Sequence, residues 1–227
     1  MSIASRIKQV RGLLHRSGTR SLPEDLLVNA FHKVYYDGRQ TWLSYHGYTI
    51  IKNPLDLWAY QTLLWDLRPD LVIETGTYEG ASALWLAHQA DVLGTTMRVV
   101  TIDVDGQPVR PKHQRIEYLT GSSIDPGVLT VVGHRASVAD NVLVILDSDH
   151  SRDHVLSECR AYAQFVTPGS YLIVEDSNIN NHPVRAASGP GPWEAIKIFT
   201  SENHDFAVDR AREPMLSMNP HGYLRRT

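Results

Sequence analysis

Acidic side chains close two of the apolar runs in this sequence, at points where buried strands would end. Asp147 closes one run, and the adjacent pair Glu175 and Asp176 closes the run 171–174. The carboxyl ends of parallel strands meet at one edge of a sheet, so these acids would repel one another unless a cation lay between them. Oxygen ligands suit a hard cation, most simply Mg²⁺. Helix capping is the alternative role for such acids, but the polar stretch 177–182 favours the metal site.

His150 lies three residues after Asp147 and therefore beside this predicted metal site. An imidazole titrates near neutral pH, so a histidine placed there can take a proton from a reacting hydroxyl. The sequence holds 11 histidines, and a surface or packing role is the simpler interpretation for most of them. The position of His150 next to the acids predicts a general base.

A second candidate site follows the apolar run 71–73. That run leads into Glu74, then into a turn bracketed by Gly76 and Gly80, then into helix-forming residues. Strand, glycine turn and helix open a nucleotide-type pocket in an α/β sheet. The spacing is G-x-x-x-G rather than the dinucleotide pattern G-x-G-x-x-G, and a carboxylate at the strand end repels phosphate. The carboxylate of Glu74 suits a ligand with an ammonium group, such as S-adenosylmethionine (SAM). On this motif alone, a tight turn that binds no ligand is an equally open interpretation.

Further candidate contacts for SAM come from the same turn and from the ends of later runs. Asp103 ends the run 98–103, where an α/β pocket binds ribose hydroxyls. Ser123 follows another run and is a candidate contact for adenine, with a turn or cap role equally open. The remaining predicted contacts are Thr77, Tyr78, Ser82 and Asp147.

The elements that must position these residues alternate along the chain. Strands are predicted near 71–73, 98–103, 115–120, 141–147, 171–175, 206–209 and 215–224. Helices are predicted near 24–36, 53–68, 81–93 and 192–199, with one more starting at 125 and another that follows the loop 148–154 and runs through 162. This alternation indicates one α/β sheet dominated by parallel strands. We expect a catalytic domain over residues 53–227 and an N-terminal helical and aromatic extension over residues 1–52.

The extension begins with a basic stretch and continues into an aromatic one. Residues 1–23 carry five arginines and lysines and no acid, with apolar residues at helical spacing, so we expect an amphipathic helix that packs across subunits of a homo-oligomer. The rings within 41–52 predict a small satellite core, with a lid over the pocket as the alternative.

Composition narrows the class of protein. The chain of 227 residues is 42% hydrophobic, and its net charge of −3 argues against a nucleic-acid partner. No apolar run is long enough to cross a bilayer, and the single cysteine, Cys159, excludes an internal disulfide. We expect a cytoplasmic protein without a membrane partner.

Four motifs together resemble the cephalosporin hydroxylase/rhamnosyl O-methyltransferase family. They are Glu74-Thr-Gly-Thr-Tyr-Glu-Gly-Ala-Ser82, Leu146-Asp-Ser-Asp-His-Ser151, Tyr171-Leu-Ile-Val-Glu-Asp176 and Gly189-Pro-Gly-Pro-Trp-Glu-Ala195. The resemblance spans about residues 53–199. It implies a class I methyltransferase (Rossmann-like) sheet of seven strands with helices on both faces. It also implies Asp147, Glu175 and Asp176 as Mg²⁺ ligands, with His150 as the base.

These observations predict a SAM- and Mg²⁺-dependent O-methyltransferase that acts on a hydroxyl of a small molecule, a sugar on a bacterial natural product such as an antibiotic. Asp147 and His150 are the predicted catalytic residues. The alternatives are a component of a cephalosporin-type hydroxylation or methoxylation system, and a non-catalytic SAM-binding partner subunit.

Overall fold

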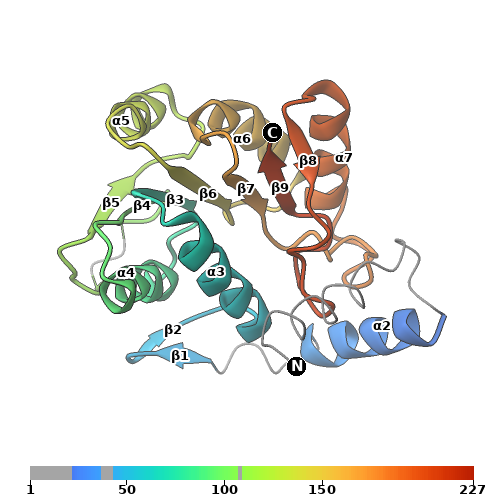
Figure 1. Ribbon diagram of the computed structural model, residues 1–227. Coiled ribbons are helices and arrows are strands. Elements are labelled where there is room, and N and C mark those ends of the chain that lie inside the picture. Colours follow the sequence, from blue (N-terminus) through green and yellow to red (C-terminus); the bar gives the residue numbers. More distant parts are fainter. Residues whose placement is uncertain (1–21, 37–42, 107–108) are drawn as a thin grey trace, which may run out of the picture.

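The structure is a computed structural model that describes residues 22–36, 43–106 and 109–227 (Figure 1). Its helices are α2 (Leu22–Tyr36), α3 (Pro54–Leu67), α4 (Ala81–Leu93), α5 (Pro126–Ala136), α6 (Arg152–Tyr162) and α7 (Pro192–Glu202), with a short 3₁₀ turn at Ala163–Phe165. Its strands are β1 (Ser44–Tyr45), β2 (Tyr48–Thr49), β3 (Leu71–Thr75), β4 (Arg98–Asp103), β5 (Ile116–Thr120), β6 (Val142–Leu146), β7 (Tyr171–Val174), β8 (Phe206–Val208) and β9 (Tyr223–Arg226).

Seven of the strands form one sheet in the order β5-β4-β3-β6-β7-β9-β8. The first five are parallel, and β9 runs antiparallel to both β7 and β8. The strand order reverses direction between β3 and β6, so the ends of these two strands flank the crevice where ligands bind in such sheets. The predicted seven-stranded α/β sheet with an antiparallel end is confirmed.

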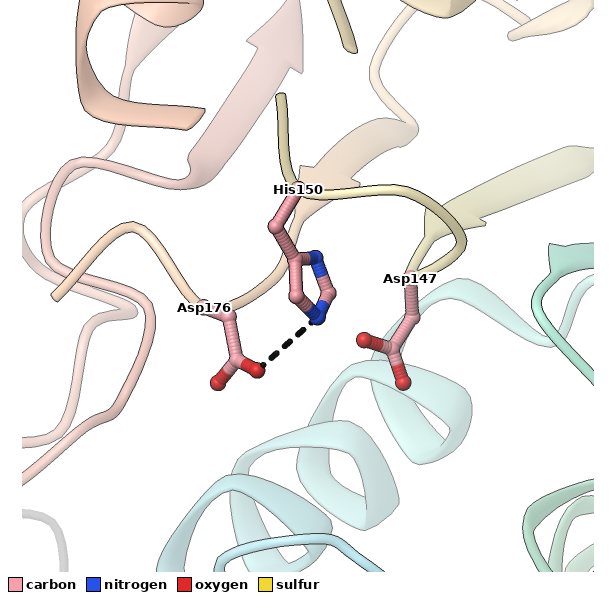
Figure 2. Close-up of side chains that lie close together, drawn as sticks. All are labelled: Asp147, His150 and Asp176. Atoms are coloured by element: carbon pink, nitrogen blue, oxygen red, sulfur yellow. Dashed lines mark ion pairs between the residues drawn. The ribbon is translucent and has the colours of Figure 1, made fainter. Parts of the chain in front are cut away.

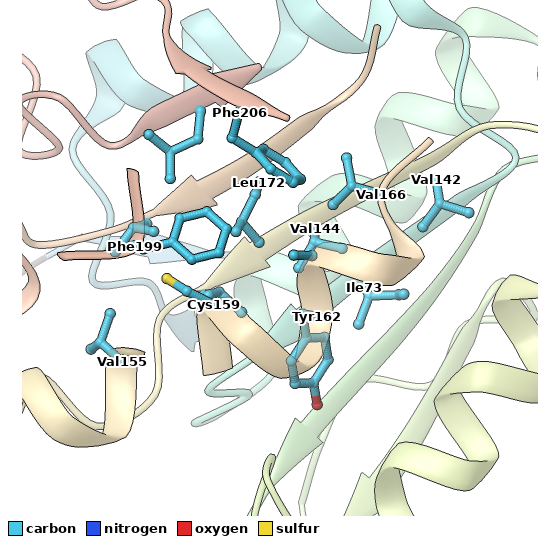
Figure 3. Close-up of a cluster of buried hydrophobic side chains, with 14 of the residues drawn as sticks. Ile73, Val142, Val144, Val155, Cys159, Tyr162, Val166, Leu172, Phe199 and Phe206 are labelled. Atoms are coloured by element: carbon cyan, nitrogen blue, oxygen red, sulfur yellow. The ribbon is translucent and has the colours of Figure 1, made fainter. Parts of the chain in front are cut away.

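Helices cover both faces of this sheet, as Figure 1 shows. On one face α5, α6 and α7 pack against the strands around Cys159, Tyr162 and Phe199, all buried (Figure 3). On the other face α3 and α4 pack through Leu64 and Leu86. The central strands β3, β6 and β7 are buried along their whole length, which explains their continuous apolar runs.

Local sequence sets where the helices begin. The side chain of Asn53 caps α3 by accepting a hydrogen bond from the Leu55 amide at 3.2 Å, and Asp125 caps α5 in the same way through the amides of Gly127 and Val128. A proline in the first turn of each helix needs no hydrogen-bond donor there. These caps place Asn53 and Asp125 at the sheet edge that carries the candidate site.

The predicted last strand is wrong in its extent. Residues 215–222 form turns instead of a strand, and β9 begins only at Tyr223. The reason is polar burial: Ser217 donates to Asp56 at 2.5 Å, and Asn219 donates to Tyr60 at 3.0 Å. Side-chain hydrogen bonds to α3 therefore hold this segment in place of strand pairing.

The aromatic stretch of the extension forms the β1–β2 hairpin, which packs on α4. Tyr45 shares a hydrogen bond of 2.8 Å with His88 Nδ1, and the Thr49 amide donates to Glu79 at 2.6 Å. The predicted helix over 1–21 and its packing across subunits lie outside the described residues and stay predictions. Within the described part of the chain, no helix combines the length and the apolar character needed to cross a bilayer.

Candidate active site

The two glycines of the turn after β3 meet different requirements. Gly76 has φ +84°, and a Cβ there would lie 1.8 Å from the backbone carbonyl oxygen of Asp147. Only glycine fits, because the turn rests directly on the end of β6. Gly80 has φ +78° and begins α4, where a Cβ would lie 3.0 Å from the hydroxyl of Tyr118. At Gly76 it is therefore the protein's own backbone, at Asp147, that leaves no room for a side chain.

A cavity of about 540 Å³ opens above this turn. Its walls include most of the residues predicted to bind SAM or to act in catalysis: Gly76, Thr77, Tyr78, Ser82, Asp103, Ser123, Asp147, His150 and Asp176. The extension contributes residues 49–52, and α6 contributes His154. Three predicted residues, Glu74, Gly80 and Glu175, do not line the cavity and lie around it.

Glu74 is fully buried at the end of β3, behind the wall of the cavity. Its Oε2 accepts a hydrogen bond of 2.8 Å from Thr101, whereas its Oε1 is buried with no hydrogen-bond partner among the described residues. Burial raises the pKa of Glu74, and the nearby ammonium of Lys52 opposes that rise. The carboxylate therefore places a buried negative charge directly behind the wall, beside Ser82, which lines the cavity.

Asp103 faces the cavity at the end of β4. Its Oδ2 accepts from the Tyr78 amide at 2.7 Å, and its Oδ1 accepts from the Asp105 amide at 3.0 Å. A carboxylate has about four acceptor positions in all, so both oxygens can still accept from the hydroxyls of a ribose. Two backbone amides therefore fix an acceptor at the predicted ribose position.

Ser123 lies on the cavity wall after β5 and is almost fully buried. Its hydroxyl shares a hydrogen bond of 3.1 Å with His154 Nε2, which also lies 3.6 Å from the buried Glu158. The hydrogen bond with Glu158 raises the pKa of His154, against the effect of burial. Sequence reasoning left His154 without a role, because its direction on α6 was not fixed by the pattern.

The other end of the cavity holds an acidic cluster (Figure 2). Asp147 follows β6, His150 lies in the loop before α6, and Asp176 follows β7. Each offers one ligand atom, and these atoms lie within 4.8 Å of one another, an arrangement that could hold a metal ion. His150 Nε2 also forms an ion pair with Asp176 Oδ2 at 3.2 Å.

Glu175, the third predicted metal ligand, is not a member of this cluster. Its Oε1 accepts hydrogen bonds from Lys52 Nζ at 2.6 Å and from the hydroxyl of Tyr60 at 2.8 Å. The geometry thus favours Asp147 and Asp176 as ligands, and a direct role for Glu175 stays a prediction.

Two residues that sequence reasoning missed reach the cluster from the N-terminal side. Lys52 Nζ lies 2.5 Å from Asp147 Oδ2, and the hydroxyl of Tyr36, at the end of α2, donates to Asp176 Oδ1 at 2.8 Å. Both partners are about a hundred residues away or more in the chain, and no motif links them to the acids.

The charges of the cluster shift its proton affinities. Burial would lower the pKa of His150, but the hydrogen bond and charge of Asp176 outweigh it and raise that pKa to about 9. Burial and the charge of Asp147 raise the pKa of Glu175 to about 8, while Lys52 opposes the rise. Burial also raises the pKa of Asp147, although the Lys52 ammonium opposes it.

The donor set fits a divalent cation. The carboxylates of Asp147, Glu175 and Asp176, together with the ammonium of Lys52, leave two negative charges when these four groups are ionised and His150 is neutral. Carboxylate oxygens are preferred ligands of Mg²⁺, which usually takes only one or two of them and keeps several waters. The same end of the cavity is therefore suited to bind a hard dication.

Comparisons with known proteins agree with this picture. The profile of the family described as rhamnosyl O-methyltransferase/CmcI matches residues 37–227. The rhamnosyl O-methyltransferase of Mycobacterium tuberculosis strain H37Rv is 37% identical over 213 residues, which cover 90% of this chain and 86% of the relative. The protein of the same name from Mycobacterium leprae is 34% identical and covers 90% of this chain and 89% of the relative.

Solved structures show the same fold at lower identity. A structure of CmcI with Mg and SAM has a TM-score of 0.65 at 21% identity, covering 94% of this chain and 87% of that one. A Bacillus cereus O-methyltransferase in complex with SAH has a TM-score of 0.51 at 17% identity, covering 89% and 88%. From the family match and the sequence relatives, the chain belongs to the rhamnosyl O-methyltransferase/CmcI family and is an O-methyltransferase built on a class I methyltransferase sheet.

Proposed function

We propose that this protein transfers the methyl group of SAM to a hydroxyl of a sugar on a bacterial natural product, with the help of Mg²⁺. The observation that carries the proposal is a single cavity with a nucleoside-type wall at one end and an acidic cluster at the other. Its volume falls within the range of about 300–1,000 Å³ typical of small-molecule sites. Such a cavity can hold a methyl donor and an acceptor hydroxyl side by side.

For SAM, the two fixed carboxylates supply the main contacts. Asp103 would accept hydrogen bonds from the ribose hydroxyls, since its oxygens are held at the end of β4 by backbone amides. Glu74 would attract the ammonium of the amino-acid part by its negative charge from behind the cavity wall, beside Ser82, which lines the cavity. Ser123 and His154, which share a hydrogen bond on the cavity wall, would meet the adenine.

For the acceptor, the acidic cluster supplies a base and a cation site. Asp147 and Asp176 would hold Mg²⁺, which when bound would lower the pKa of an acceptor hydroxyl. In the metal-free protein a pKa of about 9 keeps His150 protonated at neutral pH. The charge of a bound dication beside it would lower that pKa, and His150, which Asp176 orients from 3.2 Å away, would then take the hydroxyl proton on a ring nitrogen. Orientation of the two substrates against each other would supply much of the remaining rate enhancement.

The names of the relatives support the acceptor class. The mycobacterial relatives carry the name rhamnosyl O-methyltransferase, and they are identical to this chain at more than a third of the aligned positions. A sugar hydroxyl is a weak acid, so a sugar acceptor also explains why the site would need both a cation and a base.

The experiment is methyl transfer by the purified full chain to a panel of glycosides and their matched aglycones. Mass spectrometry should detect one added methyl group on a glycoside and none on its aglycone, and EDTA should abolish transfer until Mg²⁺ is restored. Full activity in EDTA would overturn the role of the metal, and methylation of aglycones alone would overturn the sugar acceptor. SAM binding without transfer to any acceptor would favour a non-catalytic partner subunit.

A further inference from the structure

Lys52 occupies an unusual position for a charged side chain. It lies between the β1–β2 hairpin and α3, and only 7% of its surface is exposed. Its ammonium contacts two carboxylates at once, Asp147 Oδ2 at 2.5 Å and Glu175 Oε1 at 2.6 Å. A buried charge is stable only when it is paired, so this ammonium and the two carboxylates depend on one another.

Neutral donors around the same carboxylates do not replace this charge. Tyr60 donates to Glu175 Oε1 at 2.8 Å, and Tyr60 itself accepts from Asn219 at 3.0 Å. A hydroxyl satisfies one lone pair but leaves the negative charges of Asp147 and Glu175 uncancelled. Without Lys52, two buried carboxylates would face each other, and repulsion would raise the cost of keeping both ionised.

The ammonium also touches the residue that the cation needs. Asp147 belongs to the group whose ligand atoms lie within 4.8 Å of one another, and its Oδ2 is the atom that accepts from Lys52. A dication bound by Asp147 would lie close to a fixed positive charge, and two like charges near each other repel.

We propose that Lys52 is a resident counter-cation of the metal site, which competes with the metal for Asp147 and replaces part of its charge when the metal is absent. The proposal rests on the proposed function, because it takes the acidic cluster as the Mg²⁺ site. Lys52 thereby weakens metal binding and stabilises the metal-free protein.

Substitution of Lys52 should have two effects of opposite direction. In Lys52→Met, which keeps the length of the side chain and removes its charge, the affinity for Mg²⁺ should rise by about tenfold or more, because the positive charge removed lies beside Asp147 and repels a dication there. The metal-free variant should also unfold at a lower temperature than the wild type, since Asp147 and Glu175 lose their shared partner.

The first measurement is calorimetric titration of metal-free full-length protein with Mg²⁺. Tighter binding by Lys52→Met supports the proposal, and equal or weaker binding overturns it. Tyr60→Phe removes a neutral hydrogen bond to Glu175 without changing the charge, so its affinity should not rise. Lys112→Met removes a charge from an exposed lysine and controls for net charge.

The second measurement is thermal unfolding in EDTA and in excess Mg²⁺. Mg²⁺ should raise the unfolding temperature of Lys52→Met far more than that of the wild type, whereas equal shifts would overturn the proposal. If Lys52→Met does not fold in EDTA, the variant can be refolded in Mg²⁺ and its affinity measured by competition with a chelator. Lys52→Gln, which keeps a hydrogen-bond donor without the charge, should behave as Lys52→Met does.

These outcomes separate the inference from the proposed function. If the wild type does not bind Mg²⁺ but Lys52→Met does, the inference holds and the metal dependence of the proposed function fails. If neither protein binds Mg²⁺, both fail. If Lys52→Met loses affinity for SAM while its Mg²⁺ affinity stays unchanged, Lys52 is a contact for the methyl donor and the inference is overturned.

Discussion

The two ends of the cavity are held together by different forces. At the nucleoside end, Asp103 accepts hydrogen bonds from the backbone amides of Tyr78 and Asp105 and forms a longer ion pair of 3.8 Å with Arg110, all from nearby residues. At the acidic end, Asp147 is fixed by the charged Lys52 and lies beside His150 of its own loop and Asp176 at the end of β7. One end rests on local hydrogen bonds, and the other rests on a balance of charges brought from distant parts of the chain.

This difference indicates how each end should respond to change. Hydrogen bonds to a charged group contribute about 1.5–3 kcal/mol each and can be lost singly, so a substitution at the nucleoside end should weaken binding and leave the chemistry intact. A charge removed from the acidic end leaves its buried partners uncompensated, so a substitution there should change reactivity while the methyl donor still binds.

The largest expected effect is that of Asp176→Asn at the acidic end. The substitution removes a proposed metal ligand and the partner that orients His150 from 3.2 Å away. The turnover number should fall by about 10²–10⁴-fold, the range of general acid–base contributions, while calorimetric affinity for SAM stays close to that of the wild type. Asp153→Asn, which alters an exposed acid on α6, should keep full activity. Retained activity in Asp176→Asn would break the contrast between the two ends.

The next effect concerns the turn that both ends share. In Gly76→Ala the new Cβ would lie 1.8 Å from the Asp147 carbonyl oxygen, whereas Gly47 has nearly the same φ, +86°, with nothing within 4 Å. Gly76→Ala should therefore cost about 3 kcal/mol or more, and Gly47→Ala only about 1 kcal/mol for its left-handed backbone. Urea unfolding of the two variants is the measurement. Equal losses of stability in the two variants would show that the left-handed backbone conformation, rather than the close contact with Asp147, requires glycine at position 76.

A smaller effect is expected for Asp103→Asn at the nucleoside end. The amide keeps one acceptor oxygen but loses the charge that would bind the ribose hydroxyls, so affinity for SAM should fall about tenfold, as for a hydrogen bond to a charged group. The turnover number at saturating SAM should stay unchanged, because the acidic cluster is untouched. A large loss of turnover at saturating SAM would contradict the separation of binding from chemistry.

The smallest effect is a pH dependence of stability through His154. Its pKa in the folded protein lies above the ordinary value of 6.5 because of Glu158. The extra stability is therefore complete below about pH 6.5 and is lost as the pH rises through the folded pKa. Unfolding of the wild type and of His154→Gln should differ more at about pH 6 than at about pH 9, by no more than about 1 kcal/mol for a partly exposed group. A pH-independent difference would exclude the pair with Glu158 as its cause.

The parts of this molecule that follow from local pattern were predictable. The strands ending at Asp103 and near Asp147 were visible as apolar runs closed by an acid, and the sheet order placed those ends on one cavity. The prediction of a strand over residues 215–222 was wrong because buried polar groups such as Ser217 hold this segment by side-chain hydrogen bonds to α3. The hydrophobic periodicity of a sequence does not reveal a side-chain hydrogen bond of this kind.

The partners of the acids were not predictable for a similar reason. Lys52 and Tyr36 belong to the extension, and each reaches an acid about a hundred residues away or more in the chain. A lone lysine or tyrosine in a sequence carries no sign of such a contact. Glu74 was identified by its place at a strand end, but only the packing shows that one of its oxygens is buried and unsatisfied.

The contact between Gly76 and the Asp147 carbonyl joins the methyl-donor turn to the first acid of the proposed metal site. The two halves of the active site therefore cannot be inherited or redesigned as independent modules. An engineer who grafts a different donor-binding turn after β3 also moves the end of β6, and with it the acid that the acceptor chemistry would need. Directed evolution toward a new acceptor should therefore keep glycine at position 76. Substitutions should be better tolerated in the extension, whose side chains reach the acidic cluster but take no part in the contact between Gly76 and Asp147.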